Sequence, residues 1–285
     1  MIGHEWSLQS IYDLARRITA KYGNDGYVLS RAIVPPQALN PKGAVVRIQV
    51  VEGYIDKVEW PPQLSHYRDF FSYYAYYAAK ITAQRPANIR TIERYLLLAG
   101  DLPGLKFSSS LRPSATPDAS VLVVQVAEKH IAALAQLDNR GTPGQGPLEY
   151  LTSVTLSNLL HQDEALTLTY AGAIPFNELN YAALNYRQVL TGEGLAWFAD
   201  GSYTWGSPDT AALDALQYRT FGPYADAGLS YPLLRSRERN LTISGLFFAW
   251  DTQSDVFSST FTDDRLRGFR ARVDGDFADP LQGID

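Results

Sequence analysis

The sequence predicts α+β domains followed by an antiparallel β-barrel that spans a membrane. Up to about residue 129, helical stripes of apolar residues alternate with short runs of two-residue period, the pattern of strands with one buried face. From His130 onward, eight strand-like runs follow one another, with lengths close to the roughly 9–11 residues of a membrane-spanning strand. Tyr and Trp often lie near the ends of these runs, as they do at membrane interfaces.

The composition of the 285-residue chain excludes several functional classes. The net charge of −5 and the lack of any basic run give no sign of nucleic-acid binding. The chain has no cysteine, which rules out thiolate metal sites, cysteine nucleophiles and disulfides. It also has no run of the roughly 20 apolar residues that a membrane helix needs, and no recognisable signal peptide.

One helix and two strands are predicted before residue 52. Apolar residues at three- and four-residue spacing predict a helix over Ser7–Lys21, with Ser7 as its N-terminal cap. Apolar and polar residues then alternate over residues 28–33 and 46–50, which predicts two strands.

A second α+β segment is predicted after Gly53. A strand over Tyr54–Trp60 opens it, and further patterns predict helices over Tyr67–Gln84 and Asn88–Ala99, then strands over Leu105–Arg112 and Val121–Glu128. The order is strand, helix, helix, strand, strand. The first segment ends in the same way, so we interpret the two as a repeat whose first copy lacks its front.

The remaining residues predict a succession of antiparallel strands. A soluble β-sandwich or barrel would also alternate, but soluble strands average only about 5–6 residues. Length and the aromatic ends therefore favour a membrane barrel. The predicted strands are Ile131–Asp138, Leu148–Asn158, Ala165–Ala173, Glu178–Val189, Gly194–Trp205, Gln217–Leu233, Asn240–Asp251 and Asp264–Asp274.

Four stretches up to about residue 160 together resemble a known family. They are Asp25-Gly26-Tyr27-Val28-Leu29-Ser30-Arg31-Ala32, Val50-Val51-Glu52-Gly53-Tyr54-Ile55, Ile92 to Gly104, and Leu137-Asp138-Asn139-Arg140-Gly141. Their order and spacing resemble the two-partner secretion transporters of the haemolysin-activator and filamentous-haemagglutinin type. No single stretch is diagnostic. The later part of the sequence matches the family only in its general pattern of strand-like runs separated by turn residues.

This resemblance implies an architecture and three domains. Residues 1–52 would be the C-terminal part of a first POTRA (polypeptide-transport-associated) domain, and residues 53–129 a second POTRA domain. Residues 130–285 would supply about eight strands, the N-terminal half of a 16-stranded outer-membrane barrel. The family's signal peptide, plug helix and later strands have no counterpart in this sequence, so we expect a fragment of a longer protein.

The resemblance also implies a function without catalysis or cofactors. The POTRA domains, in the periplasm of a bacterium, would capture an unfolded exoprotein with an N-terminal secretion domain. The outer-membrane barrel, a monomer in contact with lipid, would then secrete or activate that protein. An outer-membrane assembly factor that inserts other barrels is the alternative, although such proteins typically carry more POTRA domains. A passive porin would have none.

Client capture is expected through β-augmentation, in which an extended peptide adds a strand to a free sheet edge. We predict this edge at Leu105–Leu111, beside an aromatic helix. For any single aromatic residue of that helix, core packing is the competing interpretation. The predicted client-binding residues are Leu105, Phe107, Ser109, Leu111, Phe70, Phe71, Tyr74 and Tyr77.

Polar residues in the later strands are candidates for lining the pore, and the competing interpretation is an ordinary solvated strand face. They are Asn185, Arg187, Asp200 and Asp226. The four histidines have no metal-ligand spacing, and no phosphate-binding glycine loop or nucleophile motif occurs, so we predict neither metal nor enzyme. A group of acidic residues, Asp251, Asp255, Asp263 and Asp264, is expected in an exposed loop.

Overall fold

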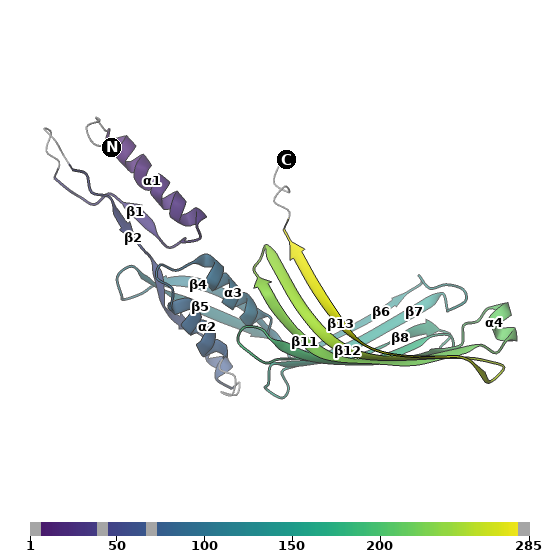
Figure 1. The fold of residues 1–285 in the computed structure, drawn as a ribbon. Coiled ribbons are helices and arrows are strands. Elements are labelled where there is room, and N and C mark those ends of the chain that lie inside the picture. Colours follow the sequence, from purple (N-terminus) through teal and green to yellow (C-terminus); the bar gives the residue numbers. More distant parts are fainter. Residues whose placement is uncertain (1–6, 39–44, 67–72, 279–285) are drawn as a thin grey trace. The chain divides into compact units, whose positions relative to one another are not determined.

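The computed structural model describes residues 7–38, 45–66 and 73–278 in two compact units (Figure 1). The first unit holds the described residues up to residue 99 together with residues 107–126. The second holds residues 100–106 and those from 127 onward. Within the described residues, no helix is long and apolar enough to cross a bilayer.

The first unit begins with helix α1 (Leu8–Asn24), which lies beside the two-stranded antiparallel sheet of β1 (Arg31–Ile33) and β2 (Gln49–Val51). Ser7 caps the helix as predicted, because its hydroxyl accepts a hydrogen bond from the Ser10 amide at 3.1 Å. Both strands are shorter than predicted. The chain turns at residues 27–30, where the Ser30 amide donates to the Tyr27 carbonyl at 3.0 Å, so β1 starts only after the turn.

The rest of the first unit is a three-stranded sheet with two helices. The strand order is β3 (Tyr54–Glu59), β5 (Ala119–Glu128), β4 (Leu105–Pro113), with β3 parallel to β5. The 3-10 helix η1 (Pro62–His66) follows β3, and α2 (Tyr73–Thr82) and α3 (Ile89–Gly100) precede β4. The order of elements agrees with the prediction. The predicted start of α2 at Tyr67 lies outside the described residues. The buried core includes Ile55, Tyr77, Ile81, Leu98, Ala99 and Leu122.

Asn88 connects the two parts of the first unit, which are α1 with its two-stranded sheet and the three-stranded sheet with its helices. Its side-chain oxygen caps α3 by accepting from the Arg90 amide at 2.9 Å, and its side-chain nitrogen donates to the Asp25 carbonyl at 3.3 Å. The Ile89 amide donates to the Gly26 carbonyl at 2.8 Å. Gly26 has a φ of +96°, and a Cβ there would lie 2.8 Å from the Asn88 side chain, so the joint needs glycine.

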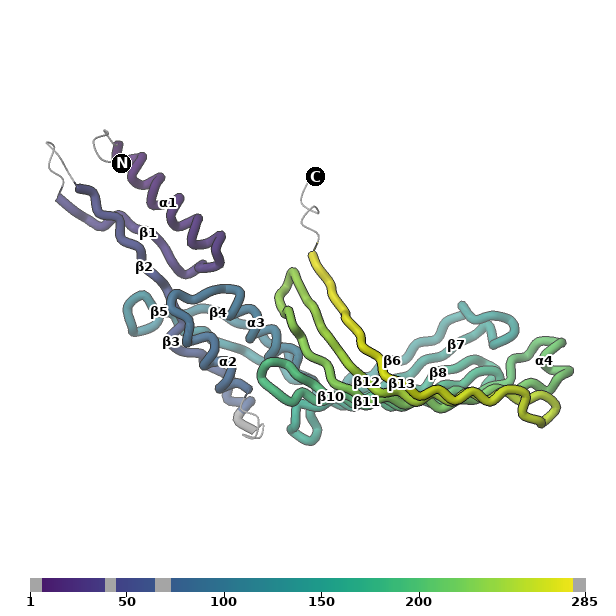
Figure 2. The backbone as a smooth tube through the Cα atoms, viewed as in Figure 1, coloured from purple at the N-terminus to yellow at the C-terminus, as the bar shows by residue number. Residues whose placement is uncertain are grey.

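The second unit is an eight-stranded antiparallel sheet in sequence order from β6 to β13 (Figures 1 and 2). A short helix, α4 (Ala211–Ala215), lies between β10 and β11. All eight predicted strands are present, although the last two extend further than predicted. The strands are β6 (Ile131–Asp138), β7 (Leu148–Ser157), β8 (Glu164–Ile174), β9 (Asn180–Val189), β10 (Ala196–Gly206), β11 (Arg219–Arg235), β12 (Arg239–Val256) and β13 (Ser259–Phe277).

The strand register gives the sheet one apolar and one polar face. Side chains alternate between faces along each strand, so residues paired across strands share a face. The row Ile131, Leu156, Leu166, Tyr186, Ala199, Ala227, Phe247 and Phe269 crosses all eight strands and defines the apolar face. The next residue along each strand belongs to the polar face, where Thr155, Thr167, Asn185, Asp200 and Asp226 form a row.

Candidate functional site

Strand β4 has a free edge, because among the residues that the structure describes it pairs only with β5. The Lys129 amide donates to the Gly104 carbonyl at 2.7 Å, and the Ser114 amide donates to the Ala119 carbonyl at 3.1 Å. Both bonds fit one antiparallel register without net shift, in which even-numbered β4 residues bond to β5. The amides of the odd-numbered residues, including Ser109, therefore point to the free edge.

The four predicted edge residues have different exposures. Ser109 is exposed and Leu111 is 50% exposed, so both are accessible to a peptide. Phe107 is half-buried. Leu105 is only 3% exposed, and its side chain belongs to the core, although its backbone lies on the edge strand.

The predicted aromatic groove is smaller than expected and contains an unpredicted residue. Tyr77 is fully buried, so for this residue the core interpretation holds and direct client contact is wrong. Tyr74 is half-buried, and its ring lies 6.4 Å from that of Phe107. Trp60, which follows β3, joins them with ring distances of 5.2 Å to Tyr74 and 6.0 Å to Phe107. Phe70 and Phe71 lie outside the described residues.

Charged residues tie the two edge strands of this sheet together. Arg112 on β4 binds both carboxylate oxygens of Glu59 on β3, at 3.0 and 2.9 Å, and Lys57 approaches the same carboxylate at 3.1 Å. Hydrogen bonds from Lys57 and Arg112 lower the pKa of Glu59 below its usual value. The ion pair between Arg112 and Glu59 crosses the face of the sheet above β5, so it leaves the backbone edge of β4 open.

The structure brings the four predicted pore-lining residues to one face of the second sheet. Asn185, Asp200 and Asp226 lie directly opposite one another on β9, β10 and β11. The Asn185 amide donates to Asp200 at 2.8 Å, and the Tyr224 hydroxyl donates to Asp226 at 2.5 Å. Arg187 lies two residues from Asn185 and so shares the polar face.

An ion pair lies at the end of the sheet where β11 meets β12. Arg235 binds both carboxylate oxygens of Asp101, at 2.7 and 2.6 Å, and also donates to Asn240 at 2.9 Å. Asn240 in turn donates to Asp276 on β13 at 3.0 Å. The chain segment before β4 is thereby connected to three neighbouring strand ends.

The predicted acidic loop is wrong. Asp251 and Asp255 lie within β12, and Asp263 and Asp264 lie within β13, because the ladder continues past the point where the apolar residues end. Asp251 pairs with Arg267 across these strands, and Asp263 pairs with Arg265. The apolar face therefore becomes charged at this end of the sheet.

Two side-chain amides hold the aromatic rings at opposite ends of the apolar face. Near one end, the hydroxyls of Tyr150 and Tyr170 donate to Asn180 at 3.2 and 2.9 Å. Near the other end, the indole of Trp197 donates to Gln188 at 2.8 Å, and the ring of Tyr186 lies 4.9 Å from that indole. Aromatic rings thus lie near both ends of the apolar face, as the sequence predicted, and the polar atoms of Tyr150, Tyr170 and Trp197 have fixed partners.

The sequence is similar to proteins of known name. Residues 1–53 match the family of POTRA domains of the ShlB type. The chain is 21% identical over 205 residues to the heme/hemopexin transporter protein HuxB of Haemophilus influenzae strain 86-028NP, covering 71% of this chain and 35% of that protein. HuxB of strain ATCC 51907 is 21% identical over 203 residues, with the same coverages. The chain spans about a third of the length of the curated relatives it matches.

Solved structures share the fold. CdiB from Escherichia coli has a TM-score of 0.66 at 16% identity, covering 96% of this chain and 51% of that chain. CdiB from Acinetobacter baumannii has a TM-score of 0.57 at 14% identity, with the same coverages. The predicted fold class is confirmed as a POTRA domain followed by a large antiparallel sheet that resembles the barrel sheet of CdiB. The resemblance to two-partner secretion transporters is also confirmed.

Proposed function

We propose that this chain belongs to an outer-membrane translocation pore that captures an unfolded exoprotein and secretes or activates it. One observation carries the proposal. An ShlB-type POTRA match leads, in a single chain, into an antiparallel sheet with one apolar and one polar face. The relatives are named as transporters, which favours transport over catalysis.

This proposal assigns one end of the second sheet to the periplasm and the other end to the cell exterior. β6 follows directly after β5, so the POTRA-side ends of the strands lie in the periplasm, together with the β11–β12 turn at residues 236–238. Because antiparallel strands alternate in direction, the β12–β13 turn and α4 lie at the extracellular end. The apolar face contacts lipid, and the polar face lines the pore.

Client capture takes place on the β4 edge. An extended segment of the exoprotein accepts hydrogen bonds from the outward amides of β4, which requires no particular client sequence. Phe107, Tyr74 and Trp60 give the adjacent surface apolar contacts, while Leu105 and Tyr77 hold the strand and helix from within the core.

Passage through the pore uses the polar face. Asn185, Arg187, Asp200 and Asp226 present amide, guanidinium and carboxylate groups to the interior. An unfolded exoprotein can exchange hydrogen bonds between these groups and water. Because the pore wall has no large apolar surface, the exoprotein is not retained there. The complete barrel acts as a monomer.

The test is deletion of the gene that encodes this chain, followed by mass spectrometry of the secreted and surface proteins. We expect one large exoprotein to disappear from outside the cell and to accumulate or be degraded in the periplasm. Porins should remain at their normal level in the outer membrane. A general fall in porins, with no exoprotein lost, would favour the barrel-assembly function instead.

A further inference from the structure

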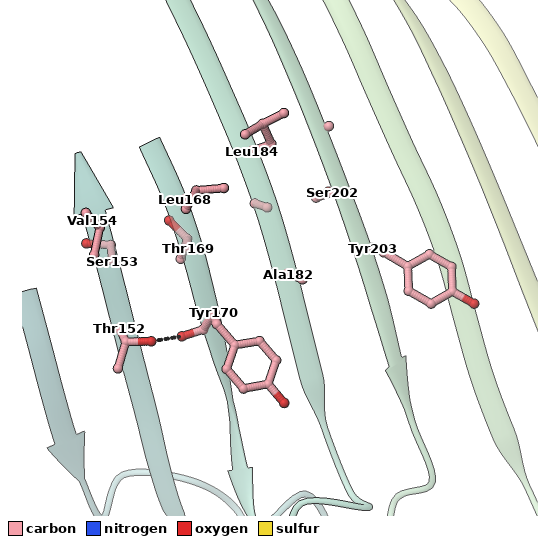
Figure 3. Close-up of a pocket in the computed structure, with 12 residues that line it drawn as sticks. Thr152, Ser153, Val154, Leu168, Thr169, Tyr170, Ala182, Leu184, Ser202 and Tyr203 are labelled. Carbon is pink, nitrogen blue, oxygen red and sulfur yellow. Dashed lines mark hydrogen bonds between the residues drawn. The ribbon is translucent and has the colours of Figure 1, made fainter. Parts of the chain in front are cut away.

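The apolar face of the second sheet is hollowed across β7 to β10 (Figure 3). A groove of about 550 Å³ lies there, lined by the small residues Ala182 and Gly201 and by the larger side chains of Val154, Leu168, Leu184, Tyr170 and Tyr203. Figure 3 shows the rings of Tyr170 and Tyr203 on either side of the strand that carries Ala182. The groove has the size of a small-molecule pocket, about 300–1,000 Å³.

The register explains why the surface is hollow at this place. Tyr170, Ala182 and Tyr203 lie directly opposite one another, so a methyl group separates two large rings. In the next row, Leu168 and Leu184 are followed by Gly201. A Cβ built on Gly201 would have its nearest neighbour 4.0 Å away, so no side chain of the described residues fills this space.

The groove is bounded at its extracellular end by an aromatic belt. The ring of Trp205 lies 5.6 Å from that of Tyr203 and 6.3 Å from that of Tyr170. The Tyr170 hydroxyl is bonded to Asn180 at 2.9 Å. The Tyr203 hydroxyl makes no hydrogen bond to any residue that the structure describes, and Tyr203 is 42% exposed.

We propose that this groove binds one acyl chain of a membrane lipid, whose polar head lies at the Tyr203 hydroxyl. The inference rests on the proposed outer-membrane location. The groove lies within the apolar face, between the belts held by Asn180 and Gln188, where lipid tails are the surrounding solvent. Its walls are apolar, so a hydrocarbon chain leaves no buried polar group without a partner.

The shape of the groove is the reason why a lipid binds there in preference to the rest of the apolar face. Between lipid tails and an apolar surface there is no hydrophobic driving force, so preferential binding comes from van der Waals contact. A chain seated between two rings has contacts on three sides, whereas a chain on the flat rows of the sheet has contacts on one. The Tyr203 hydroxyl adds a hydrogen-bond donor at the depth of the head group.

The test uses the full 285-residue chain in detergent micelles with palmitoyl-oleoyl phosphatidylethanolamine, and native mass spectrometry counts the lipid retained. Gly201→Leu fills the groove, whereas Gly245→Leu adds the same side chain elsewhere on the apolar face, where nothing lies within 4 Å of a new Cβ. Ala182→Leu fills the groove from the row that contains Tyr170 and Tyr203. We expect Gly201→Leu and Ala182→Leu each to lower retention of one lipid about threefold, as expected for the loss of a few van der Waals contacts.

Each outcome is decisive. Retention that falls for both groove variants and stays at the wild-type level for Gly245→Leu supports the acyl-chain site. Equal retention in all variants overturns it while leaving the membrane location intact. A lipid-free dimer that Gly201→Leu dissociates would assign the groove to a second copy instead. Failure of the wild-type chain to float with vesicles of the same lipid would overturn both the groove and the membrane location.

Discussion

At the scale of single residues, Asn180 has the most consequential position on the apolar face. It is 3% exposed and accepts hydrogen bonds from two tyrosine hydroxyls, while its own amide donates to the Phe176 carbonyl. Replacing it leaves three polar groups without a partner in a poorly hydrated place. We expect Asn180→Leu to lower the free energy of unfolding by about 1–3 kcal/mol.

Urea unfolding in micelles, followed by tryptophan fluorescence, measures this loss. Asn177→Leu is the matched control, since Asn177 is exposed in the same connection between β8 and β9. If both variants unfold at the same urea concentration, Asn180 does not hold the tyrosines in the way described.

Asp163 gives the second unit a pH dependence. This buried residue lies in the turn between β7 and β8, and burial, followed by the nearby charge of Glu164, raises its pKa to about 6. The folded state therefore favours the neutral acid. The stability from this group is complete below pH about 4 and is lost as the pH rises through 6. Asp163→Asn should thus be more stable than wild type by about 2–3 kcal/mol at pH 7.5 and equal to it at pH 4.

Unfolding curves at pH 4, 6 and 7.5 measure this difference. A constant difference across the three values would mean that the Asp163 carboxyl does not titrate with a raised pKa.

The residues that sequence could and could not predict differ in how local their contacts are. Ser7 was predicted as a cap because a cap bonds to an amide two or three positions away. Trp60 was missed because its partners, Tyr74 and Phe107, come from other elements. Tyr77 was assigned to the groove because a helix with aromatics on several faces does not reveal which face is buried.

At the scale of elements, the edge of β4 gives a sharp test of client capture. Ser109→Pro removes an amide that points to the free edge, whereas Ser110→Pro removes an amide that bonds to β5. We expect Ser109→Pro to weaken binding of the secreted exoprotein while leaving the unfolding midpoint close to wild type. Ser110→Pro should lower the unfolding midpoint.

Pull-down of the exoprotein identified by gene deletion, combined with circular dichroism, measures both effects. Unchanged capture by a well-folded Ser109→Pro variant would rule out the β4 edge as the client site.

The ring of Tyr150 on β7 covers Gly172 on β8, which stabilises close pairing of the two strands. Tyr150 lies opposite Gly172, and a Cβ on Gly172 would lie 2.8 Å from the Tyr150 hydroxyl and 2.3 Å from the Leu179 carbonyl. We expect Gly172→Val to cost about 1–3 kcal/mol of stability. Gly245→Val, with open space around it, should change stability by less than about 0.5 kcal/mol. Equal urea midpoints for the two variants would contradict this account.

The number and order of elements followed from the sequence because a two-residue period is visible without tertiary information. Their ends did not. β12 continues to Val256 although Asp251, Gln253 and Asp255 interrupt its apolar alternation, because backbone pairing with β13 and the ion pair with Arg267 sustain the ladder.

At the scale of the whole molecule, the second sheet has two strands that pair on one side only among the described residues. These are β6 and the 19-residue β13. Unpaired strand groups are costly in lipid and form a template for association. We expect the 285-residue chain in micelles to associate through these edges, so that light scattering coupled to size exclusion gives masses above that of one chain. A single monomeric species would show that the edges are satisfied in another way.

The fold class was predictable because two patterns with different periods occupy different parts of the chain. The resemblance to a family added what periodicity lacks, namely the identity of the α+β segments. The groove on the apolar face was not predictable, since it depends on Ala182 and Gly201 being opposite Tyr203 and Leu184, and register is a property of the folded sheet.

The unequal lengths of the strands have a consequence on the periplasmic side. β11 to β13 have 17–19 residues, against 8–11 in β6 to β10, so at about 3.3 Å per residue they are roughly 25 Å longer. Ala196 at the start of β10 pairs with Ser230, whereas Gly206 at its end pairs with Thr220, so residues 231–235 of β11 extend beyond β10 at the end that carries the β11–β12 turn. In the proposed orientation, these strand ends form a rigid ridge below the lipid. Periplasmic proteases and an arriving exoprotein would meet this ridge first, and its paired backbone makes it resistant to cleavage.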